Sequence, residues 1–202
     1  ARRQRQMCIR DRNKLFETIK NRRSIGNLTT PVPSKNELNE LFALAMTAPD
    51  HKQLNPWRFV VLTGGGLGSF GQALERAGKQ NAKTQGEKLS AKDREKLRLM
   101  PKRAPMIVAV ISDFKVHKKV PEFEQLLALG ACVQNFLLGL ESLGYRSVWR
   151  TGLLANHPMI QDFFGVKAPN MIVGFIYVGT SGVVLPKRKP IDVGQFVQYQ
   201  LD

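Results

Sequence analysis

The sequence predicts a single domain in which a β-sheet is sandwiched by helices. With 202 residues, 43% of them hydrophobic and 23% charged, the chain can bury one core without disulfides or a metal. Its apolar periodicities place two helices first and then strands separated by helices of unequal length. No repeat period is present, which favours a layered sheet over a solenoid or a regular barrel. The 11 Phe and ordinary counts of Gly and Pro exclude collagen, a coiled coil and a wholly disordered chain.

The first twelve residues, ARRQRQMCIRDR, differ in composition from the rest of the chain. They contain five Arg and one Asp and have no apolar periodicity. We interpret residues 1–12 as a basic tail that is extraneous to the fold, and the alternative is a basic arm. Residues 13–202 are therefore expected to form the single domain.

Two amphipathic helices open this domain. The first is expected over about residues 13–22, with apolar side chains spaced to cover one face, namely Leu15, Phe16 and Ile19. The second begins at a capping box formed by Ser34 and Glu37 and ends at Pro49.

The middle of the chain is expected to place two helices between two strands. The predicted elements are a strand at Trp57–Leu62, a helix at Leu67–Arg76, a charged helix at Glu87–Met100 and a strand at Met106–Ser112. Because the second of these helices is strongly charged, we interpret this region as a solvated cover.

A long apolar helix is expected to form the centre of the core. Pro121 opens it, it runs to Leu143, and Gly144 ends it. Since it is apolar on nearly all sides, it should be buried. The elements after it are a strand at Tyr145–Trp149, a short helix capped by Asn156, a strand at Met171–Val178 and an extended tail from Pro186 that can leave its own subunit.

Cysteine usage and hydropathy indicate the cellular environment. Cys8 and Cys132 lie in different contexts, and no Cys and His cluster has zinc-ligand spacing, so we expect a reducing compartment and no metal. The N-terminus lacks the apolar core of a signal peptide. The most apolar stretch, residues 125–140, is short for a membrane span and contains Gln134 and Asn135. We therefore expect a cytoplasmic protein without a membrane partner.

The net charge of +15 raises the possibility of a nucleic-acid-binding module. Such a module would place basic residues on one face with aromatic residues between them. Around residues 87–102, however, charges of both signs surround the helix and no aromatic residue occurs. A solvated face explains this segment better, and no nucleic-acid partner is expected.

A glycine pattern follows the first predicted strand. Gly66, Gly68 and Gly71 satisfy the GxGxxG spacing of a dinucleotide fingerprint. The next strand, however, comes more than thirty residues later and after two helices, and no acidic residue follows at the offset that would hold a ribose. We set this match aside.

Three other segments are candidates for binding a small molecule. Arg22, Arg23 and Ser24 end the first helix, either as cations that complement the helix dipole or as a phosphate clamp. His51 lies among polar residues between a helix end and a strand start, either as an ordinary surface residue or as part of a small-molecule site. The segment Trp149–Gly152 has two interpretations. It is either a core tryptophan followed by a turn, or a segment that contacts an anion or the ring of a ligand.

These segments together carry a resemblance. NRRS at the end of a helix, APDHK with NPW beyond it, an apolar helix ending in LGY, and VWRTG at a strand end occur in this order. From about residue 15 to residue 178, including VPEFEQ, GACVQ and IVGFIYVGT, the chain resembles the nitroreductase family of FMN flavoproteins. The resemblance implies an α+β fold with a mostly antiparallel sheet between helices. It also implies a homodimer with an extended C-terminal arm and an FMN in each of two interface grooves.

The resemblance also assigns roles to individual positions. The positions that match FMN contacts are Arg22, Arg23, Ser24, Thr47, His51, Trp149, Arg150, Thr151 and Arg188. The positions that match a nicotinamide-nucleotide segment are Gly139, Leu140, Glu141, Ser142, Leu143 and Gly144. Among the FMN contacts, Thr47 and His51 would come from across the dimer. Two departures are Thr151, where the closest relatives have Ser, and Asn55, where the family usually has Gln.

The function implied by the resemblance is redox chemistry carried by the cofactor. FMN would accept hydride from NADH or NADPH and reduce a nitroaromatic, quinone or similar small acceptor in a ping-pong mechanism. No side chain is then expected to act as nucleophile or to bind a metal, and a basic groove would attract these anionic ligands. A flavin-binding protein without redox turnover would use the same residues, so it stays open beside the nucleic-acid-binding alternative.

Overall fold

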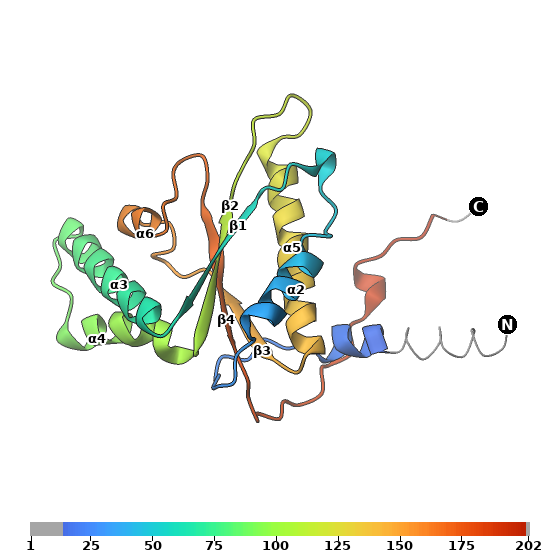
Figure 1. Ribbon diagram of the computed structural model, residues 1–202, viewed down its shortest axis with the longest axis horizontal. Coiled ribbons are helices and arrows are strands. Elements are labelled where there is room, and N and C mark those ends of the chain that lie inside the picture. The colour runs from blue at the N-terminus through green and yellow to red at the C-terminus, as the bar shows by residue number, and fades with distance from the viewer. Residues whose placement is uncertain (1–13, 201–202) are drawn as a thin grey trace.

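The sheet of this protein contains four strands that are antiparallel throughout. The computed structural model describes residues 14–200. Its strands are β1 (Trp57–Thr63), β2 (Met106–Ser112), β3 (Arg146–Arg150) and β4 (Ile172–Gly179), hydrogen-bonded in the order β1-β2-β4-β3 (Figure 1). Every residue of β2 is buried, as expected for a wholly apolar central strand. The antiparallel sheet implied by the family resemblance is therefore confirmed.

Helices cover both faces of the sheet. On one face lie α2 (Lys35–Ala45) and α5 (Glu122–Ser142), and on the other lie α3 (Gly65–Thr84), α4 (Ala91–Leu99) and α6 (Pro158–Phe163), as Figure 1 shows. The described residues also form the short 3₁₀ turns η1 (His51–Gln53), η2 (Met100–Arg103) and η3 (Val193–Gln195). The predicted arrangement of a sheet between helices is confirmed.

The largest difference from the predicted elements is the length of α3, which runs eight residues past the predicted end at Arg76. Two of its glycines, Gly71 and Gly78, are explained by packing against α4. A Cβ at Gly71 would lie 2.1 Å from the carbonyl oxygen of Arg98, and a Cβ at Gly78 would lie 2.3 Å from Leu97 Cδ1. In the GxGxxG match, Gly71 therefore allows α3 and α4 to pack closely. The neighbouring helix α4 starts at Ala91 instead of the predicted Glu87.

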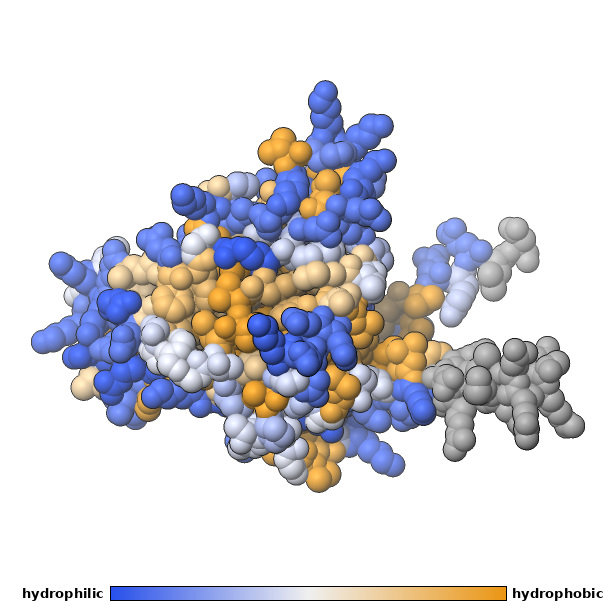
Figure 2. All heavy atoms as spheres, viewed as in Figure 1, coloured by the Kyte–Doolittle hydropathy of each residue, from blue (hydrophilic) through white to orange (hydrophobic). Residues whose placement is uncertain are grey.

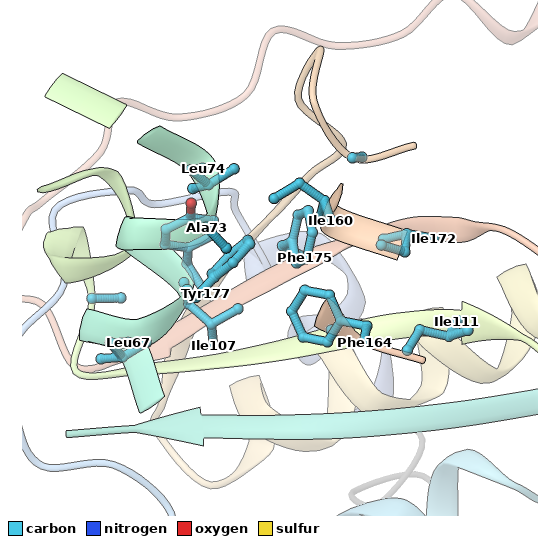
Figure 3. Close-up of a cluster of buried hydrophobic side chains, with 14 of the residues drawn as sticks. Leu67, Ala73, Leu74, Ile107, Ile111, Ile160, Phe164, Ile172, Phe175 and Tyr177 are labelled. Carbon is cyan, nitrogen blue, oxygen red and sulfur yellow. The ribbon is translucent and has the colours of Figure 1, made fainter. Parts of the chain in front are cut away.

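The face covered by α3 and α6 contains a closed aromatic cluster (Figure 3). Phe70 is 1% exposed, and its ring centroid lies 5.2 Å from that of Phe164 and 5.0 Å from that of Phe175. Such tilted and edge-on ring pairs add stabilisation beyond the burial of their area. These rings pack against one another within one chain.

The long helix α5 begins and ends as predicted. Gly144 follows it with a φ of +84°, and the amide of Tyr145 donates to the carbonyl of Leu140, which is a glycine C-terminal cap. Cys132 in its middle is fully buried, and burial raises the pKa of its thiol to about 12. By length and composition α5 could cross a membrane, but it packs between α2 and the sheet as a core helix.

The burial of α5 is nevertheless incomplete, in contrast to the prediction. Phe123 is 63% exposed and Leu127 is 68% exposed. Helix α5 is apolar on nearly all sides, but α2 and one face of the sheet cover only part of its surface. Phe123 and Leu127 therefore stay exposed.

The cap of the short helix α6 differs from the prediction. His157 is the N-cap, and its side chain accepts from the amide of Met159. Asn156 instead accepts from the amide of Ile172 at 3.1 Å and so joins the loop to β4. The predicted cap is wrong by one residue because Pro158 occupies the first helical position.

The two ends of the described chain lie on the same side of the molecule (Figure 1). Residues 14–21 are helical, and the apolar face predicted for this helix is about half exposed at Leu15, Phe16 and Ile19. The segment after Pro186 is largely irregular and exposed, as predicted. The basic tail at residues 1–12, with Cys8, and the predicted helix start at Asn13 lie outside the described residues.

Candidate cofactor site

The segment after the first helix lies beside the edge strand β3. Ser24 forms a parallel bridge with Ser147, and the amide of Ile25 donates to the carbonyl of Ser147 at 3.0 Å. Arg23 Nη1 donates to the carbonyl of Pro186 at 2.9 Å, which brings the C-terminal arm to the same place. Three segments far apart in the sequence therefore meet here.

This meeting point gathers positive charge. Arg188 on the arm donates to the carbonyl of Arg22, and the position of a Cβ at Gly26 would be 2.7 Å from Arg150 Nη2. Within residues 14–200, Arg22, Arg23, Arg150 and Arg188 form no ion pair. Guanidinium groups that have no carboxylate partner favour an anion such as phosphate.

An open groove adjoins this arginine cluster. It has a volume of about 900 Å³ and lies between residues 20–25, the end of α5 and residues 183–191 of the arm. Arg146 and Glu141 form an ion pair of 2.8 Å at its wall. Glu141 therefore has its charged partner in Arg146.

An apolar cavity of about 520 Å³ opens beside Arg150 and Thr151. Its walls come mainly from α3, the segment leading into α4, α4 itself and β4, for example Phe70, Leu74, Leu89, Leu97 and Phe175. The guanidinium carbon of Arg150 lies 5.7 Å from the ring centre of Tyr177. Burial raises the pKa of Tyr177, while the charges of Arg150 and Arg103 act in the opposite direction.

Arg103 lines the candidate site, although the sequence analysis did not indicate it. It lies in η2 and lines the same cavity as Arg150. In the sequence it is one of several basic residues shortly before a buried strand, and nothing local marks it as a cavity residue. The cavity therefore combines apolar walls with two guanidinium groups and suits a flat ring with polar edges.

Trp149 does not line this cavity. Its ring packs over Gly174 of β4, where an added Cβ would lie 2.3 Å from Trp149 Nε1. It remains 36% exposed. Of the three predicted contacts at the end of β3, Arg150 and Thr151 lie at the cavity and Trp149 lies on another surface.

The other two predicted flavin contacts lie elsewhere in the chain. Thr47 follows α2, and its hydroxyl donates to the carbonyl of Leu44 at 2.8 Å. His51 Nδ1 lies 2.9 Å from an oxygen of Glu124 in the first turn of α5. Glu124 and Glu141, at opposite ends of α5, are about 26 Å apart along the axis at 1.5 Å per residue. The two groups of candidate flavin contacts therefore lie at opposite ends of one helix.

The predicted nicotinamide segment is partly inaccessible. Gly139 and Leu140 are buried, and a Cβ at Gly139 would lie 2.7 Å from Leu41 of α2. Ser142 donates to the carbonyl of Gly139 at 2.8 Å. Only the end of the segment, at Ser142, Leu143 and Gly144, is exposed.

The charges around α4 are largely paired or solvated. Glu75 on α3 binds Lys79 at 2.9 Å and Arg94 at 3.0 Å, and these partners lower the pKa of Glu75. Figure 2 shows hydrophilic side chains over this end of the molecule. The paired charges agree with a solvated cover.

A family model described as "Nitroreductase family" matches residues 19–180. The Escherichia coli (strain K12) protein named "Putative NAD(P)H nitroreductase YdjA" is 36% identical over 165 residues, which are 82% of this chain and 87% of that protein. A Haemophilus influenzae protein named "Putative NAD(P)H nitroreductase" is 30% identical over 181 residues, 88% of this chain and 95% of the relative.

Solved structures show the same fold. A nitroreductase-like family protein from Bacillus cereus superposes with a TM-score of 0.77 at 23% identity, covering 92% of this chain and 95% of that one. The FMN-dependent nitroreductase NfnB from Mycobacterium smegmatis, solved in complex with NADPH, has a TM-score of 0.69 at 17% identity, covering 94% and 99%. At these identities the likeness concerns the fold.

Proposed function

This chain belongs to the nitroreductase family, and from that premise we propose that it is an FMN-dependent oxidoreductase of the cytoplasm. It takes hydride from NADH or NADPH and reduces small acceptors of the nitroaromatic or quinone kind. The observation that carries this proposal is the arginine cluster formed by Arg22, Arg23, Arg150 and Arg188, which is free of carboxylate partners in the described chain. Residues 13–202 act as one FMN-binding domain.

The residues of this cluster fit FMN by their chemistry. Guanidinium groups from three segments hold the phosphate through charge-assisted hydrogen bonds, and Ser24 adds a hydroxyl. Arg150, Arg103 and Thr151 border an apolar cavity of about 520 Å³ that receives the ring. When bound, FMN supplies the hydride-transfer chemistry, and the protein supplies binding, orientation and electrostatics.

The second half-site is supplied by a second copy of the chain. Because the His51 region and the arginine cluster lie at opposite ends of α5, one mononucleotide cannot reach both within one chain. Phe123 and Leu127 on α5 and Phe16 near the N-terminus are exposed apolar residues that a two-fold partner would cover. Figure 2 shows apolar surface beside the terminal segments. A homodimer with two such interface sites accounts for both features.

Removal of the two adjacent arginines tests the binding site. Arg22→Ala/Arg23→Ala should weaken FMN binding about 100-fold, because two charge-assisted hydrogen bonds are lost. Titration of FMN fluorescence measures this change. The control is Lys92→Ala/Lys96→Ala, which removes the same charge from α4 and should leave FMN binding unchanged. Equal losses in both variants would indicate a general charge effect and contradict the proposal.

Steady-state kinetics test the reaction. Since the nicotinamide and the acceptor use the same face of the bound ring in turn, double-reciprocal plots at several acceptor concentrations should be parallel. Intersecting lines would contradict alternating occupancy. Yellow protein that NAD(P)H does not bleach would instead indicate flavin binding without turnover.

A further inference from the structure

We propose that Glu124 is a positioning residue that holds His51 for its contact with the flavin of the partner subunit, an inference that rests on the function proposed above. Glu124 lies in the first turn of α5, and His51 begins η1. His51 Nδ1 and Glu124 Oε2 are 2.9 Å apart, although 73 residues separate them in the chain. This hydrogen bond ties the loop after α2 to the long helix.

The bond decides which ring nitrogen of His51 can meet a ligand. An ionised carboxylate only accepts hydrogen bonds, so Nδ1 of His51 must carry the hydrogen. The ring plane is then fixed by Glu124, as when a carboxylate orients a histidine that binds a metal. Among the described residues no group bonds to Nε2 of His51. Nε2 is therefore the nitrogen presented to the ligand.

The pair lies in an open hollow that a second subunit can close. The hollow has a volume of about 520 Å³ between η1 and α5, and most of its wall is apolar, including Leu127 and Ala128. The His51 side chain is 51% exposed and that of Glu124 is 35% exposed. When a partner covers this hollow, water leaves, and the bond between carboxylate and imidazole becomes stronger in the lower dielectric.

The loop that carries His51 has an imposed shape. Lys52, Gln53 and Asn55 have φ values of 68°, 51° and 51°, a region unfavourable for residues other than glycine. Asp50 accepts from the amide of Asn55 at 2.6 Å through one oxygen, and its other oxygen is buried without a partner. Such strain persists only where surrounding contacts hold the backbone, and it concentrates at ligand-binding segments. Glu124 provides such a contact from outside the loop.

The experiment is a double-mutant cycle on the full chain, with the dissociation constant of FMN as the readout. Glu124→Gln and His51→Ala should each weaken FMN binding about tenfold. The double variant should bind no more weakly than His51→Ala alone, since Glu124 acts through His51. Glu122→Gln, an exposed acid in the same helical turn, should have no effect.

A spectroscopic signature separates positioning from folding. In FMN-free protein, ¹⁵N NMR should show the Nδ1–H form of His51, and Glu124→Gln should shift the population toward Nε2–H while the melting temperature is unchanged. Additive losses in the cycle would overturn the positioning role. Tight FMN binding that Glu124→Gln leaves unchanged would overturn only this role, whereas a wild-type protein that binds no FMN would overturn the proposed function and this role with it.

Discussion

The two faces of the sheet differ in how completely one chain covers them. On the α3 and α6 face, Phe70 and its aromatic neighbours are enclosed. On the opposite face, α2 and α5 enclose Leu129, Cys132 and Phe136, yet the outer side of α5 is left open. The aromatic cluster on the α3 and α6 face is therefore buried within one chain, whereas apolar side chains on the outer side of α5 are exposed.

This difference bears on the two half-sites that we propose. The His51 region borders the open side of α5, and the arginine cluster lies at the far end of the same helix. Exposed apolar side chains that lie together, such as Phe123 and Leu127 on α5, can mark an interaction site. We therefore expect the α3 and α6 face to stabilise the chain and to border the proposed ring cavity, and the open side of α5 to complete the proposed site through assembly.

The largest expected effect comes from a charge on the open face. Leu127→Glu should abolish the dimer and with it FMN retention, because a carboxylate would be buried without a partner at the interface. Sedimentation should then show a species of the monomer mass, 22.7 kDa. Leu99→Glu on α4, whose side chain is 44% exposed, is the matched control and should remain a dimer. A Leu127→Glu dimer that stays yellow would contradict the assignment of the two faces.

The next effect tests the closed face. Phe70→Ala should lower the free energy of unfolding by about 3–5 kcal/mol, because a buried ring is replaced by a cavity. Urea unfolding of FMN-free protein measures this loss. Phe70→Leu should restore most of the stability, with a cost of about 1.5 kcal/mol or less. A loss below about 1 kcal/mol for Phe70→Ala would show that this cluster is not the main source of stability.

The smallest effect concerns the cap of α2 on the open face. The amide of Ser34 donates to Glu37 at 2.8 Å, and this bond is the main cause of a lowered pKa for the Glu37 carboxyl. Because the pKa of Glu37 is lower in the folded protein than its ordinary value of 4.5, the ionised carboxylate stabilises the fold at pH values above 4.5. This stabilisation is lost as the pH falls through the folded-state pKa.

Unfolding measured across this pH range tests the cap. Glu37→Gln should be slightly less stable than wild type at neutral pH, and the difference should shrink in acid. Glu40→Gln, exposed on the same helix, controls for the change in charge. A difference that grows as the pH falls would contradict the sign of this effect.

Local sequence signals predicted much of the fold. Gly144 ended α5, Ser34 and Glu37 began α2, and the apolar run at Met106–Ser112 became the central strand. These features depend on residues close in the sequence. The length of α3 could not be predicted in this way. Gly78 disfavours a helix by its local propensity, and the contact with Leu97 that explains it comes from a distant segment.

The site was predicted less completely. The residues themselves indicated Arg22 and Arg23, and the resemblance added Arg188. In the structure Arg188 donates to the carbonyl of Arg22, and Arg23 donates to the carbonyl of Pro186. The resemblance did not indicate Arg103 or Glu124, because their roles depend on contacts between segments distant in the chain. The nucleotide segment was assigned by position alone, and the burial of Gly139 and Leu140 follows from packing against α2.

Complementation between two defective chains tests most directly whether two copies build each site. Arg22→Ala/Arg23→Ala removes one half-site, and His51→Ala weakens the other. If the halves come from different chains, mixed dimers made by co-expression contain one intact site, so that about a quarter of all sites in a random mixture regain wild-type affinity for FMN. If each site were built within one chain, co-expression would restore no FMN binding, and the account would be wrong.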